Sequence, residues 1–224
     1  MEPRSDAVAG VKPPWFNGSR AKRRVAAGWA VVIVLGIYGC SAAAPAIPKI
    51  ANTDNVVAFG DSLTFGTGAG ENENYPAVLA RLIGHAVIAA GVPGETTAQG
   101  LQRLPEILDA HRPKVLILCM GGNDMLRQVD DAQIVAKLRA MIAMARARGA
   151  NVVLLGVPRP TLFGGAPQFY QSISEEFGLP YEGEVIPDVL HSPRLKSDPI
   201  HPNAEGYRRI AKAVAALLRD AGAL

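Results

Sequence analysis

Short, strongly apolar runs alternate with longer amphipathic stretches along most of the chain. The apolar runs are rich in Val, Ile, Leu and Ala and end at Gly or polar residues, which is typical of buried strands. They cover residues 56–59, 86–90, 114–120 and 152–155. Apolar residues recur at helical spacing over residues 75–83, 101–108, 130–148, 168–177 and 204–220. Strands that alternate with helices predict an α/β fold built on a mainly parallel, doubly wound sheet.

Residues near the predicted helix ends refine these boundaries. Thr96 and Thr97 can cap the second helix and Asn203 the last, because their side chains accept hydrogen bonds from the first free N–H groups. Pro105 lies inside the second helix and predicts a kink or a restart there. The stretch 158–197 has six prolines and no long periodic run, so we expect mostly loops there, facing the substrate.

The composition fits one globular domain. Of the 224 residues, 49% are hydrophobic and 19% are charged, which is enough apolar material for a proper core. The overall charge of +3 is concentrated in residues 1–41, which carry +4 and leave −1 for the rest. A near-neutral folded region lacks the clustered basic surface that phosphate binding needs, so we expect no nucleic-acid partner.

The N-terminus has the layout of an export signal. The basic cluster Lys22-Arg23-Arg24 precedes an uncharged run over residues 25–39 and then a series of small residues. We therefore divide the chain into a basic N-terminal region (1–24), a signal, lipoprotein or membrane-anchor segment with its linker (25–50), and a folded domain (51–224). The positive charges stay on the cytoplasmic side, so we expect an exported bacterial protein that is periplasmic or anchored to the membrane.

Three fates of the segment 25–50 stay open. The string Ile37-Tyr38-Gly39-Cys40 resembles the bacterial lipobox, in which the cysteine is lipidated and becomes the new N-terminus, although Tyr38 is bulkier than usual. The alternatives are cleavage after a small residue in 41–44 and retention as an uncleaved anchor. The second cysteine, Cys119, lies in an apolar run and is interpreted as a small buried hydrophobe, so no intramolecular disulfide is expected.

Five residues with catalytic chemistry follow the predicted strands or precede the last helix. Ser62, Gly94 and Asn123 come after the first, second and third strands, and Asp198 and His201 lie in the final loop. Because parallel strands end at one edge of a sheet, we expect these residues to converge. There His201 can act as the base for the Ser62 hydroxyl, with Asp198 orienting its ring. The N–H groups of Ser62 and Gly94 and the Asn123 amide would hold an oxyanion.

The blocks around these residues resemble the four blocks of the GDSL, or SGNH, hydrolases: Gly60-Asp61-Ser62-Leu63, Gly94, Gly121-Gly122-Asn123-Asp124 and Asp198-x-x-His201-Pro202. The resemblance covers residues 51–224 and is greatest to the bacterial lysophospholipase, thioesterase and arylesterase members. It implies a flavodoxin-like three-layer α/β/α sandwich with a mainly parallel five-stranded sheet. It also implies hydrolysis of carboxyl esters, thioesters or lysophospholipids through an acyl-serine, with no metal or other cofactor.

The expected partner is accordingly a small acyl ester, with membrane association through the N-terminal segment or its lipid, and we expect a monomer. Asp61 and Asp124 are expected to bond backbone amides in their own loops.

One departure from the family pattern concerns substrate choice. Many relatives carry Asn-Ala-Ser ahead of the second block's glycine, whereas Pro93 stands immediately before Gly94 here and brings no polar side chain. The substrate preference of those relatives is therefore not carried over to this chain.

Four other functions make different demands on these residues. A carbohydrate O-acetyl esterase of the cell envelope would use the same catalytic groups in a shallow polar cleft, whereas an apolar cleft would favour acyl chains. A non-catalytic lipoprotein that binds acyl or glycan ligands has no need of an intact Ser62 and His201. An α/β-hydrolase would require Gly-x-Ser-x-Gly, but Thr64 stands at the last position. A binuclear metallophosphoesterase needs more ligands than the four histidines supply.

Overall fold

The computed structural model describes residues 45–160 and 164–224, and a five-stranded parallel sheet lies at the centre of this part. The strands are β1 (Val56–Gly60), β2 (Val87–Gly91), β3 (Val115–Cys119), β4 (Asn151–Leu155) and β5 (Tyr181–Glu182). Their order is β2-β1-β3-β4-β5, and every neighbouring pair is parallel. β1 and β3 are buried along their whole length, as expected for strands covered on both faces.

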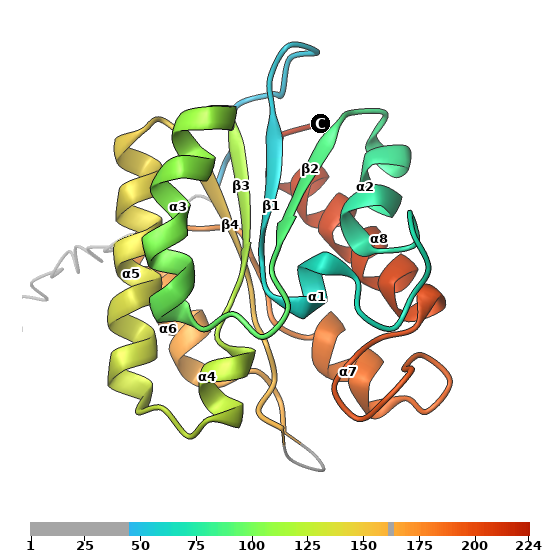
Figure 1. Cartoon of the computed structure of the whole chain (residues 1–224). Coiled ribbons are helices and arrows are strands. Elements are labelled where there is room, and N and C mark those ends of the chain that lie inside the picture. Colours follow the sequence, from blue (N-terminus) through green and yellow to red (C-terminus); the bar gives the residue numbers. More distant parts are fainter. Residues whose placement is uncertain (1–44, 161–163) are drawn as a thin grey trace, which may run out of the picture. The chain divides into compact units, whose positions relative to one another are not determined.

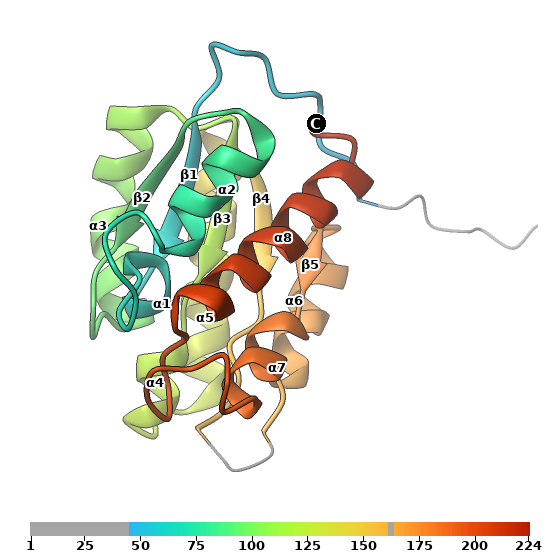
Figure 2. The same cartoon turned by 90° about the vertical axis from the view of Figure 1, so that its right-hand side faces the viewer.

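Helices cover both faces of this sheet. On one face lie α2 (Tyr75–Ile83) and α8 (Ala204–Asp220), and on the other lie α3 (Thr97–His111) and α5 (Asp131–Ala147) (Figure 1). Figure 2 shows α8 running along the sheet next to α2. Its buried stripe includes Tyr207, Ile210 and Val214, at the spacing of one helix face. The predicted three-layer α/β/α sandwich is therefore confirmed.

The longer predicted helices are found close to their predicted bounds. α6 (Gln168–Phe177), α2 and α8 coincide with the predicted ranges. Thr96 caps α3 in a reciprocal capping box with Gln99, and Asn203 caps α8 by accepting a hydrogen bond from Gly206 N. The predicted restart at Pro105 was wrong, because α3 continues through it as one helix. Leu104 and Leu108 are fully buried around this proline, and their packing offsets its cost of about 3 kcal/mol.

Three short helices and the last strand were not predicted. These are α1 (Ser62–Phe65), α4 (Gly122–Leu126), α7 (Val185–His191) and β5. The expectation of loops between 177 and 197 was thus wrong in part. Pro187 argued against a helix there, yet it lies in the first turn of α7, where N–H groups have no acceptor within the helix.

The direction of strand addition reverses between β1 and β3. The chain adds β2 on one side of β1, then crosses over to β3 and continues outward to β5. The carboxyl ends of β1 and β3 therefore form a topological switch point, where open α/β sheets bind ligands. α1 follows β1 and α4 follows β3 directly, and both helices lie at the same edge of the sheet, near α7 (Figure 1). Ser62 and Asn123 belong to these two short helices.

The described chain begins at the opposite edge of the sheet. Ile47 N and Ile50 N donate to the carbonyls of Ala221 and Ala223, both at 2.8 Å, and the Ile47 side chain is buried. Within residues 45–160 and 164–224, no helix combines the length and the apolar character needed to cross a membrane. The basic N-terminal region 1–24, the apolar run 25–39 and the predicted lipidation site Cys40 lie outside the described residues.

Candidate active site

The turn after β1 places Ser62 at the first position of α1. Asp61 caps this helix, and its Oδ1 accepts a hydrogen bond of 3.0 Å from Leu63 N. Gly60 is required by space, because a Cβ there would lie 2.5 Å from the Cys119 carbonyl oxygen and would also collide with the Thr64 side chain. The tight turn lets α1 start immediately beyond the sheet, with the Ser62 side chain in the cavity described below.

Ser62, His201 and Asp198 form a continuous chain of hydrogen bonds. His201 Nε2 lies 3.0 Å from Ser62 Oγ, and His201 Nδ1 lies 2.7 Å from Asp198 Oδ2. With a proton on Nδ1 held by the carboxylate, Nε2 is the acceptor for the serine hydroxyl proton. His201 is thus within hydrogen-bonding distance of Ser62, and Asp198 of His201, as predicted. This geometry can activate the hydroxyl as a nucleophile.

The loop from Asp198 to His201 is fixed by its own carboxylate. Asp198 Oδ1 accepts hydrogen bonds from Ile200 N and His201 N, both at 2.9 Å. Partial burial opposes ionisation of Asp198, but the Ile200 N–H and the His201 ring and N–H outweigh it and hold the pKa of this carboxyl below its ordinary value. Asp198 therefore stays charged and can orient the imidazole at neutral pH.

Ser62 and Gly94 both line the cavity, and their backbone N–H groups are the predicted oxyanion donors. Neither Ser62 N nor Gly94 N donates to an acceptor within the described residues. Gly94 has a φ of 79°, in the left-handed region that side chains disfavour, and this turn gives its peptide the required direction. Arg127 Nη2 donates to Gly94 O at 3.0 Å and so holds the next peptide, the one between Gly94 and Glu95. The two predicted backbone donors of an oxyanion hole thus line the same cavity.

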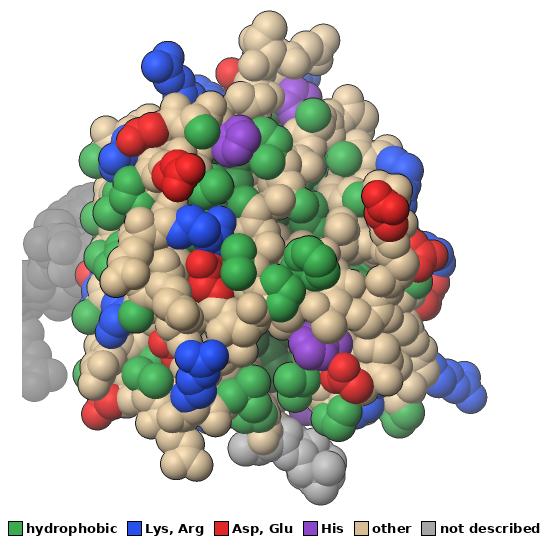
Figure 3. All heavy atoms as spheres, in the orientation of Figure 1, with side chains coloured by type: hydrophobic (Ala, Val, Ile, Leu, Met, Phe, Trp, Pro, Cys, Tyr) green, Lys and Arg blue, Asp and Glu red, His purple; other side chains and the backbone are tan. Residues whose placement is uncertain are grey.

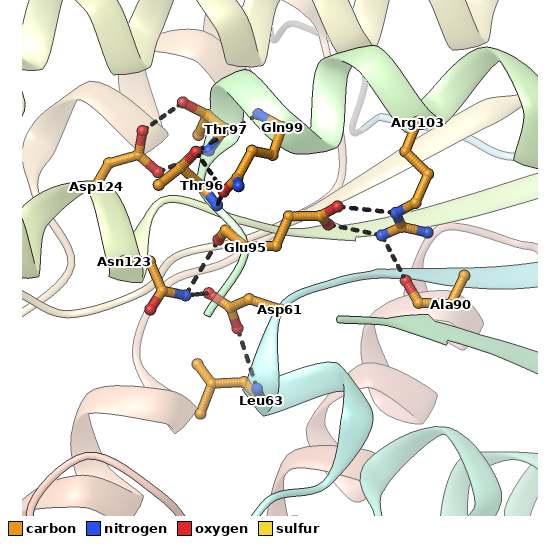
Figure 4. A network of polar contacts seen from close by, with 10 residues as sticks. All are labelled: Asp61, Leu63, Ala90, Glu95, Thr96, Thr97, Gln99, Arg103, Asn123 and Asp124. Atoms are coloured by element: carbon orange, nitrogen blue, oxygen red, sulfur yellow. Dashed lines mark hydrogen bonds and ion pairs between the residues drawn. The ribbon is translucent and has the colours of Figure 1, made fainter. Parts of the chain in front are cut away.

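The amide of Asn123 is held by two acceptors. Its Nδ2 donates to Asp61 Oδ2 and to the Glu95 carbonyl oxygen, each at 3.1 Å (Figure 4). Asn123 lines the same cavity as Ser62, Gly94 and His201, and Asp198 is bonded to His201, so the structure brings the five predicted catalytic and oxyanion residues together. No sequence pattern predicts that both hydrogens of the Asn123 amide have protein acceptors. The amide is consequently oriented before a substrate is bound.

Asp124, the residue after Asn123, joins α4 to the start of α3. Its carboxylate accepts hydrogen bonds from Thr97 N at 2.7 Å and from Thr97 Oγ1 at 2.6 Å, and both residues are buried (Figure 4). Asp124 was expected to bond an amide within its own loop. It instead bonds an amide of another element, whereas Asp61 bonds Leu63 N nearby as predicted. Asn123 is thereby fixed through its backbone as well as through its side chain.

Asp61 is a carboxyl group almost without solvent contact. Burial raises its pKa from 3.8 to about 6, although the Leu63 N–H, His201 and the Asn123 amide all favour the charged form. A raised pKa means that the native state binds more protons than the unfolded state between about pH 4 and pH 6. The contribution of Asp61 to stability is therefore complete below about pH 4 and is lost as the pH rises through about 6.

The variant Asp61→Asn tests whether the contribution of Asp61 to stability falls as the pH rises. The free energy of unfolding of the variant minus that of the wild type should increase between pH 4 and pH 7, by up to about 3 kcal/mol, because the variant has no carboxyl to ionise. Urea unfolding across this pH range measures the difference. Asp109→Asn is the matched control and should give a flat difference between pH 5 and pH 7, since Arg148 lowers the pKa of that exposed carboxyl. A flat difference for Asp61→Asn as well would contradict the prediction.

The site opens into a cavity of about 670 Å³. Ten of its lining residues are aliphatic or proline: Leu63, Pro93, Leu126, Val157, Pro158, Pro160, Leu190, Pro193, Pro199 and Ile200. Hydrophobic side chains border the hollow in the lower half of the face in Figure 3, where a histidine also lies. This apolar lining suits the cavity to an apolar group beside the Ser62 hydroxyl.

In the described part of the chain, no group of three or more His, Cys, Asp or Glu side chains is placed to hold a metal ion.

Comparisons with known proteins agree with this geometry. The sequence model of the GDSL-like lipase/acylhydrolase family matches residues 58–209. Esterase TesA of Pseudomonas aeruginosa is 29% identical over 177 residues, which cover 73% of this chain and 87% of that protein. Thioesterase 1/protease 1/lysophospholipase L1 of Escherichia coli is 29% identical over 179 residues, covering 76% and 86%. A crystal structure of TesA superposes with a TM-score of 0.66 at 26% identity, covering 75% of this chain and 99% of that one.

Proposed function

The chain belongs to the GDSL-like lipase/acylhydrolase family, and on this premise we propose that it is a serine esterase that cleaves acyl esters through an acyl-serine intermediate. Membership of the family makes it an esterase-type hydrolase. The observation that carries the finer proposal is the hydrogen-bonded series from Ser62 through His201 to Asp198 at the base of an apolar cavity. Nucleophile, base and orienting carboxylate are the three groups that an acyl-enzyme mechanism requires.

In the first half of the reaction, Ser62 Oγ attacks the carbonyl carbon of the ester while His201 Nε2 takes the hydroxyl proton. A tetrahedral intermediate forms, with a negative charge on the former carbonyl oxygen. When it collapses, the bond to the leaving oxygen or sulfur breaks, and His201 delivers its proton to that atom. In the second half, water attacks the acyl carbon while His201 takes its proton, and a second tetrahedral intermediate forms. When it collapses, the bond to Ser62 Oγ breaks, His201 returns the proton to Oγ, and the carboxylic acid leaves.

The negative oxygen is the point at which preorganised donors lower the barrier most. The N–H groups of Ser62 and Gly94 and the Asn123 amide are the donors that we assign to it, because all three residues line the cavity beside the nucleophile. One Asn123 N–H would be shared between the Glu95 carbonyl oxygen, which keeps the amide oriented, and the developing charge, which attracts it more strongly than a neutral carbonyl does.

The apolar lining of the cavity supports an acyl chain as the group bound beside Ser62. An O-acetyl group on a sugar would leave most of this apolar surface unfilled. The relatives point in the same direction, since their names describe an esterase and a thioesterase/lysophospholipase. We therefore propose carboxyl esters with an extended acyl chain, and thioesters or lysophospholipids of similar length, as the substrate class.

Hydrolysis of p-nitrophenyl esters from acetate to palmitate by the full chain tests this proposal. We expect kcat/KM to be higher for an ester of intermediate chain length than for acetate, and to be unaffected by excess chelator. Acetylated xylan hydrolysed in preference to every acyl ester would identify a carbohydrate O-acetyl esterase instead. A folded protein that hydrolyses no ester would identify the binding lipoprotein.

We also propose that the protein is exported and held at the membrane through a lipid on Cys40. The support is the string Ile37-Tyr38-Gly39-Cys40 after a basic cluster and an apolar run. In cells fed a palmitate analogue, the wild type should be labelled, and Cys40→Ala should lose the label completely. Cys119→Ala is the control, because the buried Cys119 thiol offers no acylation site, and it should keep the label. Labelling that persists in Cys40→Ala would refute the lipobox.

A further inference from the structure

An ion pair lies directly behind the predicted oxyanion donors. Arg103, on α3, donates from Nε to Glu95 Oε1 at 2.9 Å and from Nη2 to Glu95 Oε2 at 2.7 Å (Figure 4). The Glu95 side chain is only 6% exposed, and that of Arg103 is 22% exposed. The two residues were not singled out from the sequence, because a loop residue and a helix residue eight positions apart follow no recognised pairing rule. Neither of them lines the cavity, so neither is placed to touch a substrate.

Arg103 joins three parts of the fold at this point. Besides Glu95 it contacts the end of β2, where its Nη2 donates to the Ala90 carbonyl oxygen at 3.1 Å. Its guanidinium also stacks on the ring of Phe59 in β1, 4.2 Å from the ring centre. Phe59 itself is fully buried. The guanidinium is thus fixed against two adjacent strands, and it holds the Glu95 carboxylate in a set position.

Glu95 transmits this position to the oxyanion donors through its backbone. It follows Gly94 directly, and its carbonyl oxygen accepts the 3.1 Å hydrogen bond from Asn123 Nδ2. Its N–H donates to the Val92 carbonyl oxygen at 3.2 Å. A shift of the Glu95 side chain would therefore move both the Gly94 peptide and the acceptor that orients Asn123.

We propose that the Glu95–Arg103 ion pair is a positioning device that holds Gly94 N and Asn123 Nδ2 at the distance and angle needed by the tetrahedral oxyanion. This inference rests on the proposed function. A planar guanidinium suits the role because its two parallel N–H groups fix both oxygens of the carboxylate. A lysine ammonium would fix neither the rotation of the carboxylate nor the distance of the carboxylate from the strands. Donors displaced by a fraction of an ångström stabilise the transition state less while binding the ground state almost equally well.

Arg103→Gln, measured on the full chain with the best p-nitrophenyl ester, is the direct test. We expect kcat to fall about tenfold or more, with KM changed less than about threefold. Arg103→Lys should retain part of the rate, because it keeps the charge but loses the paired contact. Arg139→Gln breaks the Arg139–Glu176 pair, which lies outside the cavity lining, and should leave kcat unchanged. A fall in kcat for Arg103→Gln that is no larger than for Arg139→Gln would overturn the proposal.

A double-mutant cycle with Asn123→Ala separates positioning from general structural damage. Asn123→Ala alone should lower kcat by about 10² to 10³. In the Asn123→Ala background only the Gly94 N–H is left to be displaced, so Arg103→Gln should lower kcat further by about threefold, clearly less than its tenfold effect in the wild type. The full tenfold fall in that background, or an effect confined to KM, would overturn the proposal. Glu95→Gln, which keeps the shape of the side chain, replaces Arg103→Gln in the cycle if the latter fails to fold, as judged by its thermal melt.

The same assays distinguish this inference from the proposed function. Failure of the wild-type protein to hydrolyse any ester in a Ser62-dependent manner would overturn both the function and the positioning role that depends on it. Ser62-dependent hydrolysis in the wild type, together with additive losses in the cycle, would leave the esterase standing and remove only the positioning role.

Discussion

Ser62→Ala should lower kcat/KM for p-nitrophenyl ester hydrolysis by at least about 10³-fold, with no loss of folded protein. The substitution removes the oxygen that lies 3.0 Å from His201 Nε2, so no acyl-enzyme can form. It leaves the backbone N–H of residue 62 in place, and with it the oxyanion donors. The small residual rate then comes from water attacking a substrate that is still bound and polarised.

The measurement compares purified wild type and variant at equal concentration, with excess chelator present, and includes a thermal melt of each. Ser172→Ala is the matched control. Ser172 is an exposed serine on α6 whose Oγ donates to the Gln168 carbonyl oxygen, outside the cavity lining. Its loss should leave the rate within about twofold of the wild type. Normal turnover by Ser62→Ala would exclude the acyl-serine mechanism outright.

The fold was predictable wherever an element is long enough to repeat its pattern. α8 has a capping residue, Asn203, and a buried stripe over four turns, so both its start and its end were predicted correctly. β3 is a run of five buried apolar residues and was equally clear. β5 has only two residues, and α1 has a single turn, so neither shows a period in the sequence. Such elements are defined by the neighbours that pack on them, which the local sequence does not contain.

The candidate site divides in the same way. Ser62, Gly94 and Asn123 were predicted to meet because each follows a strand, and the edge of a parallel sheet brings such residues together. The contact of Asn123 with Asp61 and Glu95 was not predictable. Several polar groups lie near the switch point, and those that lose their water on folding must pair with one another. Which groups are buried depends on the packing of three separate loops. Sequence order thus predicts where site residues gather, and packing decides which atoms pair.

Two carboxyl groups near His201 illustrate why environment matters more than residue type. Asp198 is partly exposed, and its hydrogen bonds lower its pKa, so it remains an anion beside the imidazole. Asp61 is buried, and its pKa rises to about 6. Asp198 is therefore the partner that can stabilise an imidazolium throughout the neutral range. Asp61 holds Asn123 and the start of α1 at a cost to stability, as active sites commonly do.

His201→Ala should have an effect similar in size to that of Ser62→Ala, a loss of at least about 10³-fold in kcat. Without the imidazole, the Ser62 hydroxyl has no acceptor for its proton during attack, and the leaving alcohol has no donor. The loop should keep its shape, because Asp198 Oδ1 binds the backbone N–H groups of residues 200 and 201 rather than the ring. The double variant lacking both Ser62 and His201 should be no slower than either single variant, since the two groups act as one unit.

His191→Ala is the sharpest control for this experiment. His191 lines the same cavity but is not hydrogen-bonded to Ser62, so its loss should affect KM at most and change kcat by less than a few-fold. Kinetics with saturating ester, followed for each single variant and for the double variant, give the comparison. If His191→Ala were as damaging to kcat as His201→Ala, the base could not be assigned to His201. Equal and non-additive losses at residues 62 and 201 are the result that only a shared proton transfer between these two side chains explains.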